Sequence, residues 1–584
     1  MKKLICLLGI IVIFALSGCS DEPNESEVFM QNLYGKNSEI TNEYDSNLAA
    51  ICHNGTFVGT QKDSVVSFKG IPYAKAPVGE LRWKEPVPAE ADDGVYEARY
   101  FGKSPIQTEW PSEVGSYYEK GEDCLTLNIW ENANNDSTDK PVMVFIHGGS
   151  YGWGATSDPV YDGHNLVAKF DDIILVTVEY RLGMMGFIDF SAVEGGEEYN
   201  TSGNLGLLDQ VCALQWIQEN IAAFGGDPDN VTVFGESAGG GSVSLLPLID
   251  GTEGLFQRII AESGSVALTY STDECQNLAQ MLLEETGCTN MKELAALSEE
   301  ELISVNEKLN DYNCFPERDG VVLPVNLYEA YEGGSASHID MMIGTNADEV
   351  RYWNNEMGYY VPLLDGEIIY KLGLPIMYET NLKRISDADK QNIDTFMALQ
   401  NDKKIWNLTE FYNEVLFRVP AIAQAESHSK NGGNTYMYYW TYPGENEMVG
   451  ACHAIELTYI FNNLDNAIYT GDKVNTALAD AAQNMWVNFA RTGNPSTEKY
   501  AWQPYDADSR MTMVLGNEIS IVSDLKGKQR ALLEPILNYG FNGCYTNLSF
   551  NVPQVYKIVG GIVCILATFV LIIIFLKRTI QKRK

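Results

Sequence analysis

Basic residues are scarce in this chain. Lysine and arginine together number 40 against 79 aspartate and glutamate residues, so the formal net charge of the 584 residues is −39. A nucleic-acid-binding surface needs clustered Lys and Arg to neutralise phosphates, so the composition argues against a nucleic-acid partner. The acidic excess is instead typical of a solvated surface, and the apolar fraction of 45% is sufficient for a large core.

Short metal-binding and redox motifs are also missing. The 11 cysteines include no Cys-x-x-Cys pair, and none of the six histidines belongs to a His-Glu-x-x-His sequence. We therefore expect no metal site and no redox motif. The interior lacks internal repeats and long low-complexity linkers, so the sequence predicts one large domain, which we place at residues 45–550.

The N-terminus has the features of an export signal. Met1-Lys2-Lys3 precedes an apolar stretch, and this pattern predicts a signal peptide over residues 1–18. The stretch ends in Leu16-Ser17-Gly18-Cys19, which resembles the lipobox of bacterial lipoproteins. That resemblance implies a lipid attached to Cys19; the alternative is a cysteine placed there by chance. Residues 19–44 are polar and acidic, and we expect them to form a flexible tether.

The C-terminus carries a candidate membrane span. Residues 558–576 contain no charged side chain, and nineteen helical residues at about 1.5 Å each cover the roughly 30 Å of a bilayer core. Residues 577–584 contain five Lys and Arg residues, and the positive-inside rule places this basic tail in the cytoplasm. The two ends together predict attachment to the cell membrane, with the domain on the extracytoplasmic side.

Apolar strands alternate with helical segments in the body of the chain. A buried parallel strand is typically a short apolar run, whereas a strand with one covered face alternates apolar and polar residues. The sequence predicts a hairpin at 56–68, a one-sided strand at 125–130, a helix at 204–224, and buried strands at 141–146, 173–178 and 231–234. This order is typical of an α/β protein with a mainly parallel sheet that is covered on both faces.

A sharp turn follows the strand at 231–234. Gly235-Glu236-Ser237-Ala238-Gly239 places a serine between two glycines at the end of the strand and fits the nucleophile-elbow pattern. A strand can turn into a helix over so few residues only where side chains are absent at the crossing points. The turn lifts the hydroxyl clear of the backbone, so Ser237 is the candidate nucleophile.

Two longer stretches resemble a known family. Residues 224–239 and 122–130 resemble the two signatures of the type-B carboxylesterase/lipase family, the cholinesterase-like α/β-hydrolases, and the likeness extends over about residues 54–506. The resemblance implies the α/β-hydrolase fold, with a large, mostly parallel sheet of eight or more strands, helices on both faces and an active site at the carboxyl edge. It also implies a serine hydrolase that requires no cofactor.

A serine nucleophile needs a histidine base downstream in this fold, where the chain order is serine, acid, histidine. His453 lies in residues 450–457, which resemble the family's histidine loop. His428 lies in a polar segment, and we expect it to be solvated. His338 precedes the strand that should carry the acid, so the chain order excludes it. The sequence therefore favours His453 as the base.

The acid should follow the strand predicted at 341–344. Two adjacent carboxylates, Asp348 and Glu349, lie in the loop after this strand. The register of the family motif falls on Glu349, with Asp348 as the competitor and a pair of surface carboxylates as the alternative for both. Because this fold keeps its acid at the sheet edge, the surface alternative is disfavoured, and the register of the motif favours Glu349 over Asp348.

The developing oxyanion needs backbone N–H donors, which the resemblance assigns to Gly149, Ser150 and Ala238. The family usually has glycine where this chain has Ser150, so the side chain narrows the loop at that point. The resemblance also implies supporting roles for Glu236 and Ser263 behind the histidine. It further implies two structural ion pairs, Arg82 with Glu122 and Arg181 with Asp209.

These expectations combine into a surface-anchored serine carboxylesterase that hydrolyses small-molecule esters through an acyl-enzyme. The alternative is a cell-surface adhesion or binding protein on the same fold, because the family includes catalytically silent members with one C-terminal membrane helix. Such members typically lack the nucleophile, whereas Ser237, Glu349 and His453 are all present here. The enzyme is therefore the favoured hypothesis, with its substrate left open.

Overall fold

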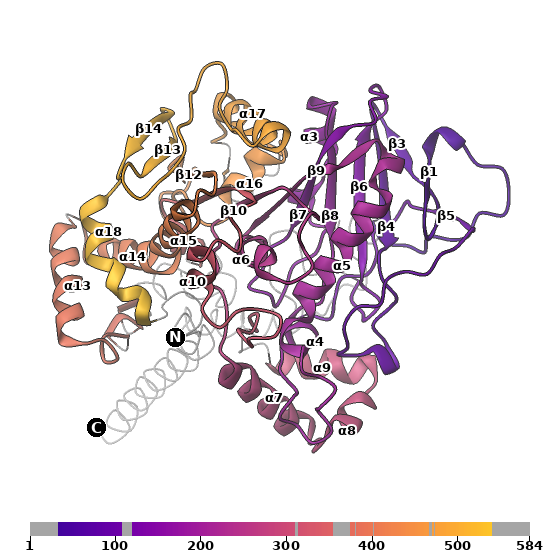
Figure 1. Cartoon of the computed structure of the whole chain (residues 1–584), viewed down its shortest axis with the longest axis horizontal. Helices are drawn as coiled ribbons and strands as arrows, with labels where there is room; N and C mark the ends of the chain where they lie inside the picture. The colour runs from indigo at the N-terminus through magenta and orange to yellow at the C-terminus, as the bar shows by residue number, and fades with distance from the viewer. Residues whose placement is uncertain are drawn as a thin grey trace, which may run out of the picture.

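A large sheet forms the centre of the computed structural model, which describes residues 33–107, 119–309, 314–353, 374–375, 377–379, 381–400, 402–465, 470–471 and 473–539. The sheet has 11 strands in the order β14-β13-β12-β11-β10-β9-β7-β8-β6-β4-β3 (Figure 1). Its strands are β3 (Thr60–Lys62), β4 (Val65–Pro72), β6 (Thr126–Asn132), β7 (Lys140–Ile146), β8 (Ile174–Val178), β9 (Gly226–Glu236), β10 (Arg258–Glu262), β11 (Asp340–Asn346), β12 (Thr435–Trp440), β13 (Met511–Leu515) and β14 (Ser520–Ser523). A small second sheet joins β1 (Ala49–Cys52), β2 (Gly55–Val58) and β5 (Val95–Glu97).

The middle of the large sheet is parallel. Every neighbouring pair from β13 through β12, β11, β10, β9 and β7 to β8 runs in the same direction. The outer strands β14, β6, β4 and β3 pair antiparallel. The predicted α/β fold with a mainly parallel sheet is confirmed, and the carboxyl ends of the seven parallel strands meet at one edge.

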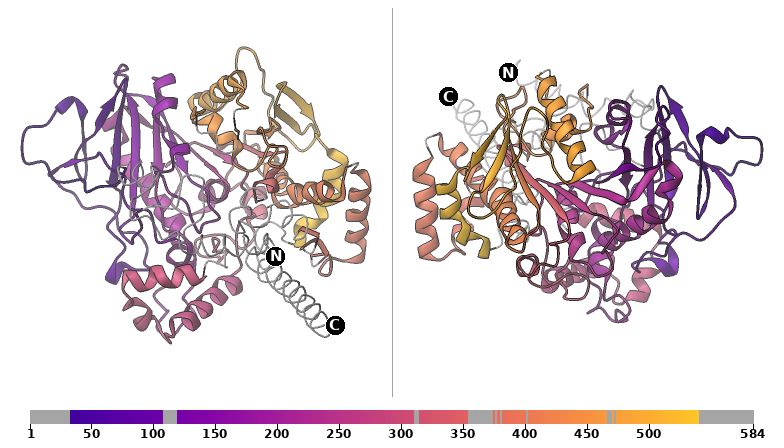
Figure 2. Two further views of the ribbon diagram at one scale, coloured as in Figure 1. Left: turned by 180° about the vertical axis from the view of Figure 1, so that it is seen from behind. Right: turned by 45° about the horizontal axis from the view of Figure 1, so that its top comes forward.

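Helices cover both faces of the sheet and pack at its β14 end. They are α3 (His164–Lys169), α4 (Gly183–Gly186), α5 (Leu205–Asn220), α6 (Ala238–Leu245), α7 (Thr272–Thr286), α8 (Met291–Ala295), α9 (Glu299–Leu309), α10 (Leu327–Glu332), α13 (Asp387–Leu399), α14 (Lys404–Asn413), α15 (Val419–Lys430), α16 (Ile455–Ile460), α17 (Thr476–Thr492) and α18 (Gly527–Leu533). Figures 1 and 2 show α13, α14 and α18 together at the β14 end, and α7, α8 and α9 grouped below the sheet.

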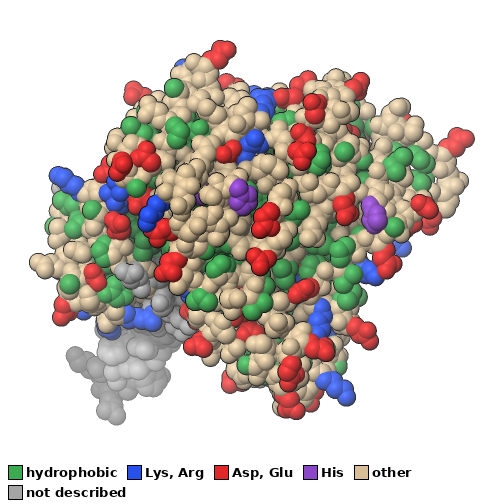
Figure 3. All heavy atoms as spheres, in the orientation of Figure 1, with side chains coloured by type: hydrophobic (Ala, Val, Ile, Leu, Met, Phe, Trp, Pro, Cys, Tyr) green, Lys and Arg blue, Asp and Glu red, His purple; other side chains and the backbone are tan. Residues whose placement is uncertain are grey.

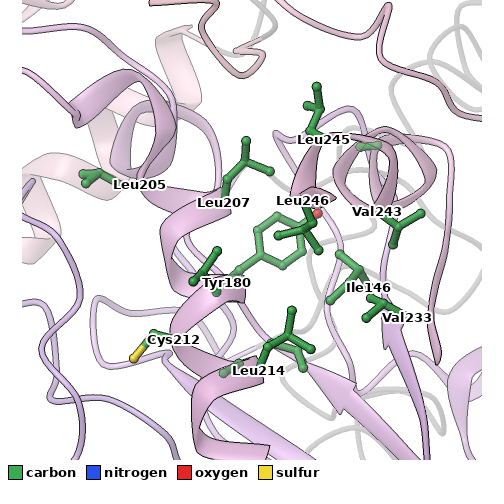
Figure 4. Packing of buried hydrophobic residues seen from close by; sticks show 14 of the residues in the cluster. Ile146, Tyr180, Leu205, Leu207, Cys212, Leu214, Val233, Val243, Leu245 and Leu246 are labelled. Carbon is green, nitrogen blue, oxygen red and sulfur yellow. The ribbon is translucent and has the colours of Figure 1, made fainter. Parts of the chain in front are cut away.

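Alternate residues of each central strand enter two different cores. In β7, Val142, Val144 and Ile146 pack with α5 and α6 in one apolar cluster, while Met143 and Phe145 pack with α3, α16 and α17 in another. Figure 4 shows part of the first cluster, where the labelled side chains of α5, α6, β7 and β9 lie together. Because both faces are covered, these strands are continuous apolar runs.

The strand at 125–130 differs from its prediction. Its alternating sequence predicted one solvent face, but in β6 only Glu131 is not fully buried. The strand lies inside the sheet between β8 and β4, and both of its faces are buried: Leu127 and Ile129 pack in one apolar cluster and Trp130 in the other. Asn128 is accommodated there because its amide donates hydrogen bonds to Thr156 and Thr177, each at 3.0 Å. The polar residue in the alternating sequence of β6 is therefore explained by hydrogen bonds inside the protein rather than by exposure to solvent.

The predicted hairpin, the long helix and the two structural ion pairs of the body are present. The hairpin at 56–68 corresponds to the antiparallel pair β3–β4, and the helix at 204–224 corresponds to α5 with a following helical turn. Both expected ion pairs form: Arg82 contacts Glu122 through two hydrogen bonds of 2.6 Å, and Arg181 contacts Asp209 at 2.8 and 2.7 Å. All four side chains are buried, which fits a structural role.

The described part of the segment predicted to be a flexible tether, residues 33–44, contacts the body of the protein. From residue 33 onward the chain is bound to the body: the Tyr34 hydroxyl hydrogen-bonds the Ser157 hydroxyl at 2.5 Å, and Asn37 donates to Lys69 and Tyr100 carbonyls at 2.9 Å. Residue composition could not reveal these contacts, because they depend on positions far along the chain. Residues 1–32, including Cys19, lie outside the described residues.

The predicted membrane span at 558–576 and the basic tail at 577–584 also lie outside the described residues. Within the described ranges, none of the helices combines the length and the apolar composition needed to cross a bilayer. On the face drawn in Figure 3, acidic side chains are spread over the surface and outnumber Lys and Arg, as the net charge of −39 implies.

Candidate active site

Ser237 lies at the carboxyl end of β9, directly before α6. Its backbone has φ 57° and ψ −119°, a conformation that is uncommon for a residue with a side chain and that is held here by two backbone hydrogen bonds. Its N–H donates to the Glu262 carbonyl and its carbonyl accepts from Gly241, both at 2.8 Å. A Cβ on Gly239 would lie 1.9 Å from the Ile146 carbonyl oxygen, so the close crossing requires glycine there. The predicted sharp turn is therefore present.

Glu349 lies just after β11, in the helical turn Glu349–Arg351, and is fully buried. Its carboxylate accepts three hydrogen bonds: from His453 Nδ1 at 2.6 Å, from Ser263 Oγ at 2.6 Å and from the Asn346 N–H at 2.7 Å. The neighbouring Asp348 points elsewhere, because its carboxylate accepts from the Ala451 N–H at 2.9 Å and pairs with Arg351 at 2.8 Å. Of the two acid candidates, the structure brings Glu349 to the histidine.

His453 lies in the loop between β12 and α16, with 4% of its surface exposed. Glu349 occupies Nδ1, while Nε2 lies 3.1 Å from Glu236 Oε1, on the residue before Ser237. Burial, followed by the nearby charges of Glu456 and Glu349, raises the pKa of Glu236 well above its usual range. Among the described residues, no hydrogen bond joins the Ser237 hydroxyl to the imidazole.

Three buried glutamates, Glu236, Glu349 and Glu456, interact with the histidine, and a fourth, Glu262, interacts with Glu236 and Glu456. Asn346 donates to Glu456 at 2.5 Å, and Trp486 Nε1 donates to Glu262. Burial and the Glu349 charge raise the pKa of Glu456 to about 7. No group of three or more His, Cys, Asp or Glu side chains in the described ranges has the arrangement of a metal site.

Three aromatic rings lie against the imidazole of His453. Trp353 stacks on it with ring centroids 5.4 Å apart, and Phe417 and Tyr352 approach at 4.9 and 5.8 Å. Phe417 belongs to a π-helical segment, Glu414–Arg418, a type of helix that is often found at functional sites. The sequence analysis missed these residues, as well as Asn346 and Glu456. The one available signal was the position of Trp353, one helical turn after Glu349.

The candidate oxyanion loop follows β7. Gly149 has φ 107° and Ser150 has φ 53°, so the loop runs through conformations that favour glycine even where it carries a serine. A Cβ on Gly149 would lie 2.0 Å from the Trp153 carbonyl oxygen. A Cβ on Gly148 would lie 3.0 Å from Ser237 Cβ, so this loop packs directly against the candidate nucleophile.

The expectation that His428 is solvated is wrong. It is 1% exposed: Nδ1 lies 2.8 Å from Thr435 Oγ1, and Nε2 lies 3.1 Å from the Ala336 carbonyl oxygen. Its segment forms α15, which packs on β11 and β12, so this histidine faces the sheet rather than the solvent. His338 is exposed in the turn before β11. Of the three downstream histidines, the structure brings His453 to Glu349.

The chain was compared with known proteins. Residues 48–532 match the model of the carboxylesterase family. The chain belongs to the carboxylesterase family. It is 36% identical over 504 residues to the para-nitrobenzyl esterase of Bacillus subtilis (strain 168), covering 82% of this chain and 97% of that protein. It is 32% identical over 514 residues to carboxylesterase 1C of Rattus norvegicus, covering 81% and 89%.

Solved structures of this carboxylesterase family agree with the fold. Carboxylesterase EST55 of Geobacillus stearothermophilus superposes with a TM-score of 0.74 at 33% identity, covering 83% of this chain and 99% of that one. The predicted α/β-hydrolase fold and family are thus confirmed. The protein is a carboxylic ester hydrolase of the serine hydrolase class, and these similarities favour the enzyme over the adhesion protein.

Proposed function

We propose that Ser237, His453 and Glu349 form the catalytic triad of this carboxylesterase. The observation that carries the proposal is the buried contact of 2.6 Å between Glu349 and His453 Nδ1, at the sheet edge where Ser237 ends β9. A carboxylate at Nδ1 fixes the proton on that nitrogen and leaves Nε2 free to act as the base. The substrate is a small-molecule carboxylic ester.

The reaction follows from these positions. Ser237 Oγ attacks the ester carbonyl carbon while its proton passes to His453 Nε2. The tetrahedral intermediate then collapses, the alcohol leaves with the proton from Nε2, and an acyl-serine remains. Water attacks this acyl-enzyme with His453 again as the base, which releases the acid and restores Ser237. Nε2 must turn from Glu236 toward Ser237 when substrate binds, and such contacts often tighten only in the substrate complex.

The oxyanion of the intermediate is assigned to the backbone N–H groups of Gly149, Ser150 and Ala238. The support is the packing of the preceding Gly148 against Ser237, which places this loop beside the nucleophile. Backbone donors of this kind act without reorganisation when charge develops. Ser150 keeps its backbone N–H, so the serine does not remove a donor.

Glu236 and Ser263 are proposed as positioning residues. Ser263 donates to Glu349 at 2.6 Å and so orients the carboxylate that orients His453. Glu236 lies 3.1 Å from Nε2. Burial raises the pKa of this carboxyl well above its usual range and so favours the protonated form, which adds no second charge that would hold the imidazole away from Ser237.

The test is the substitution Ser237→Ala, measured as hydrolysis of short-chain para-nitrophenyl esters and of para-nitrobenzyl esters, which the name of the Bacillus subtilis relative suggests. We expect kcat to fall by about 10⁴-fold or more, because the covalent route is lost. Ser520→Ala, on the exposed edge strand β14, is the matched control and should retain activity. Undiminished hydrolysis by Ser237→Ala would overturn the assignment.

We also propose that the enzyme domain within residues 45–550 is displayed outside the cell membrane. The support is the sequence of the two ends: a lipobox-like cysteine at position 19 and the apolar stretch at 558–576. Membrane fractionation should compare the full chain, Cys19→Ala, a chain ending at residue 539, and both changes together. We expect only the double variant to leave the membrane fraction. A full chain found in the soluble fraction would contradict the proposal.

A further inference from the structure

A second buried histidine–glutamate pair lies behind the oxyanion loop. His147, the last residue before Gly148, is 0% exposed, and Glu179, which follows β8, is 2% exposed. His147 Nε2 lies 3.5 Å from Glu179 Oε2. Within the described part of the chain, Glu179 forms no ion pair with Lys or Arg, and Nε2 of His147 is buried without a hydrogen-bond partner. The triad does not use either residue.

The other ring nitrogen of His147 contacts the oxyanion loop itself. Nδ1 lies 2.8 Å from the Gly148 carbonyl oxygen. This carbonyl and the Gly149 N–H belong to one planar trans peptide unit, so they point in opposite directions. A ring N–H that holds the carbonyl on the buried side therefore directs the Gly149 N–H to the opposite side. The orientation of an oxyanion donor thus depends on a proton at His147 Nδ1.

The surroundings fix the ring in this position. Tyr180 stacks on the imidazole with centroids 4.6 Å apart and donates its hydroxyl to the His147 carbonyl at 2.8 Å. A Cβ on Gly154 would lie 2.6 Å from Nδ1 and 2.7 Å from the Gly148 oxygen, so glycine is required beside this bond. Gln107 holds Gly154 through hydrogen bonds of 2.9 and 2.8 Å to its N–H and carbonyl.

We propose that His147 and Glu179 share one buried proton that keeps Nδ1 protonated and thereby aims the Gly149 N–H at the oxyanion. The inference rests on the oxyanion hole proposed above, and it makes both side chains positioning residues. A neutral imidazole carries one proton. If Nδ1 holds it, Nε2 is an acceptor and needs a donor, which a protonated Glu179 carboxyl supplies. Glu179 Oε2 also accepts from the Thr156 N–H at 2.9 Å.

The electrostatic surroundings favour this proton distribution. Burial raises the pKa of Glu179 to about 8 and lowers the pKa of His147 to about 4. Burial also raises the pKa of the other titratable groups facing the pair, Tyr34, Tyr73, Tyr161, Tyr180, Cys124 and Glu236, and so favours the neutral form of each. The nearby guanidinium of Arg181 is already paired with Asp209. At pH 7 the shared proton therefore lies on Glu179.

Loss of this proton changes the loop. Above a pH of about 8 the ionised Glu179 attracts the imidazole proton to Nε2. The lone pair of Nδ1 then faces the Gly148 oxygen at 2.8 Å, which is repulsive, and the peptide loses its fixed orientation. The expected consequence is a fall in kcat at high pH with little change in KM, because the donor acts mainly in the transition state.

The test is Glu179→Gln in the full chain, measured as kcat and KM on a short-chain para-nitrophenyl ester from pH 6 to pH 10. A glutamine nitrogen in the place of Oε2 can donate to Nε2 at every pH, but it gives up the hydrogen bond from the Thr156 N–H, which faces the same atom. We expect kcat of the parent enzyme to fall about tenfold or more between pH 7 and pH 9.5, and kcat of Glu179→Gln to stay nearly level. A parent kcat that is level to pH 10, or the same fall in both proteins, would overturn the proposal.

Two further measurements distinguish an effect of the His147–Glu179 pair from a general loss of activity or of folding. His147→Phe keeps the stacking on Tyr180 but removes the Nδ1 proton, so kcat should be about 10- to 100-fold lower at all pH values, without the high-pH fall. The Tm of the parent should decline from pH 5 to pH 8 relative to Glu179→Gln. The pKa of Glu179 is higher in the folded protein than in the unfolded chain, so its proton stabilises the fold fully at a pH below the unfolded-state pKa. This stability is lost as the pH rises through the folded-state pKa of about 8. Ser237→Ala gives the background rate of ester hydrolysis. Undiminished hydrolysis by this variant would refute the proposed triad rather than the role of the His147–Glu179 pair.

Discussion

The molecule contains two buried histidine–glutamate pairs at the same sheet edge, and they differ in how their carboxyl groups are hydrogen-bonded. Glu349 accepts hydrogen bonds of 2.6, 2.6 and 2.7 Å from three different residues, whereas Glu179 is stabilised by the single residue Thr156, whose N–H donates at 2.9 Å, and lies 3.5 Å from its histidine. Several donors stabilise a carboxylate anion, and burial without them favours the protonated form. The same two residue types can therefore provide a charged partner for a base in one place and a neutral proton donor in the other.

The pairs also differ in the ring nitrogen that faces the carboxylate. Glu349 binds Nδ1 of His453, which leaves Nε2 toward the nucleophile. Glu179 faces Nε2 of His147, which leaves Nδ1 for the backbone of the oxyanion loop. We infer that one pair acts on the proton of Ser237 and the other on the orientation of a peptide group, so substitutions should separate them.

The largest effect is expected at the charged pair. Glu349→Gln keeps the size of the side chain but removes the anion, and its amide can favour the wrong tautomer of His453. We expect kcat on a para-nitrophenyl ester to fall about 10³- to 10⁴-fold, with a KM change of less than about threefold. The same change at Glu179 removes no anion at pH 7, so the two glutamine variants should differ by orders of magnitude. A loss below tenfold in Glu349→Gln would remove the distinction between the pairs.

Asp348→Asn is the matched control for that substitution. The asparagine oxygen can still accept from the Ala451 N–H, so the segment before His453 keeps its anchor, while the ion pair with Arg351 is lost. This ion pair is about one-fifth exposed, and such pairs contribute little. We expect less than a tenfold loss in kcat. A larger loss than in Glu349→Gln would exchange the roles of the two carboxylates.

Sequence patterns predicted the features that depend on local chain geometry. The nucleophile elbow, the buried strands and the position of Glu349 after a strand all follow from the order of small, apolar and acidic residues. His428 shows the limit: Glu426, Ser427, Ser429 and Lys430 around it indicate a solvated helix, but Thr435 and the Ala336 carbonyl satisfy its ring in the interior. The residues next to His428 in the sequence do not show which side chains and carbonyls will bind its ring in the folded protein.

The Glu179–His147 pair shows the same limit more clearly. The two residues are adjacent because β7 and β8 pair in parallel, so that the residues that follow them meet at the sheet edge. In the sequence, His147 lies in a loop after one predicted strand and Glu179 lies in a segment after another, and nothing in their spacing links them. Their shared chemistry depends on burial and on the direction of single N–H groups, and neither is encoded in residue spacing.

The smallest effect is expected from Ser150→Gly, which tests whether the oxyanion loop is held by the His147 contact or by its own side chains. Ser150 has φ 53°, and a non-glycine residue there costs on the order of 1 kcal/mol, which glycine would relieve. Glycine also makes the unfolded chain more flexible, at a cost of about 0.5–1 kcal/mol. Because these terms oppose each other, the free energy of unfolding measured in urea should change by less than about 1 kcal/mol.

The kinetic expectation for Ser150→Gly follows from the His147 contact. If His147 orients the Gly148–Gly149 peptide group from its buried side, kcat of Ser150→Gly should stay within about threefold of the parent value. A tenfold change in kcat without a change in stability would mean that the Ser150 side chain itself sets the loop, and that the buried pair is not sufficient to hold it.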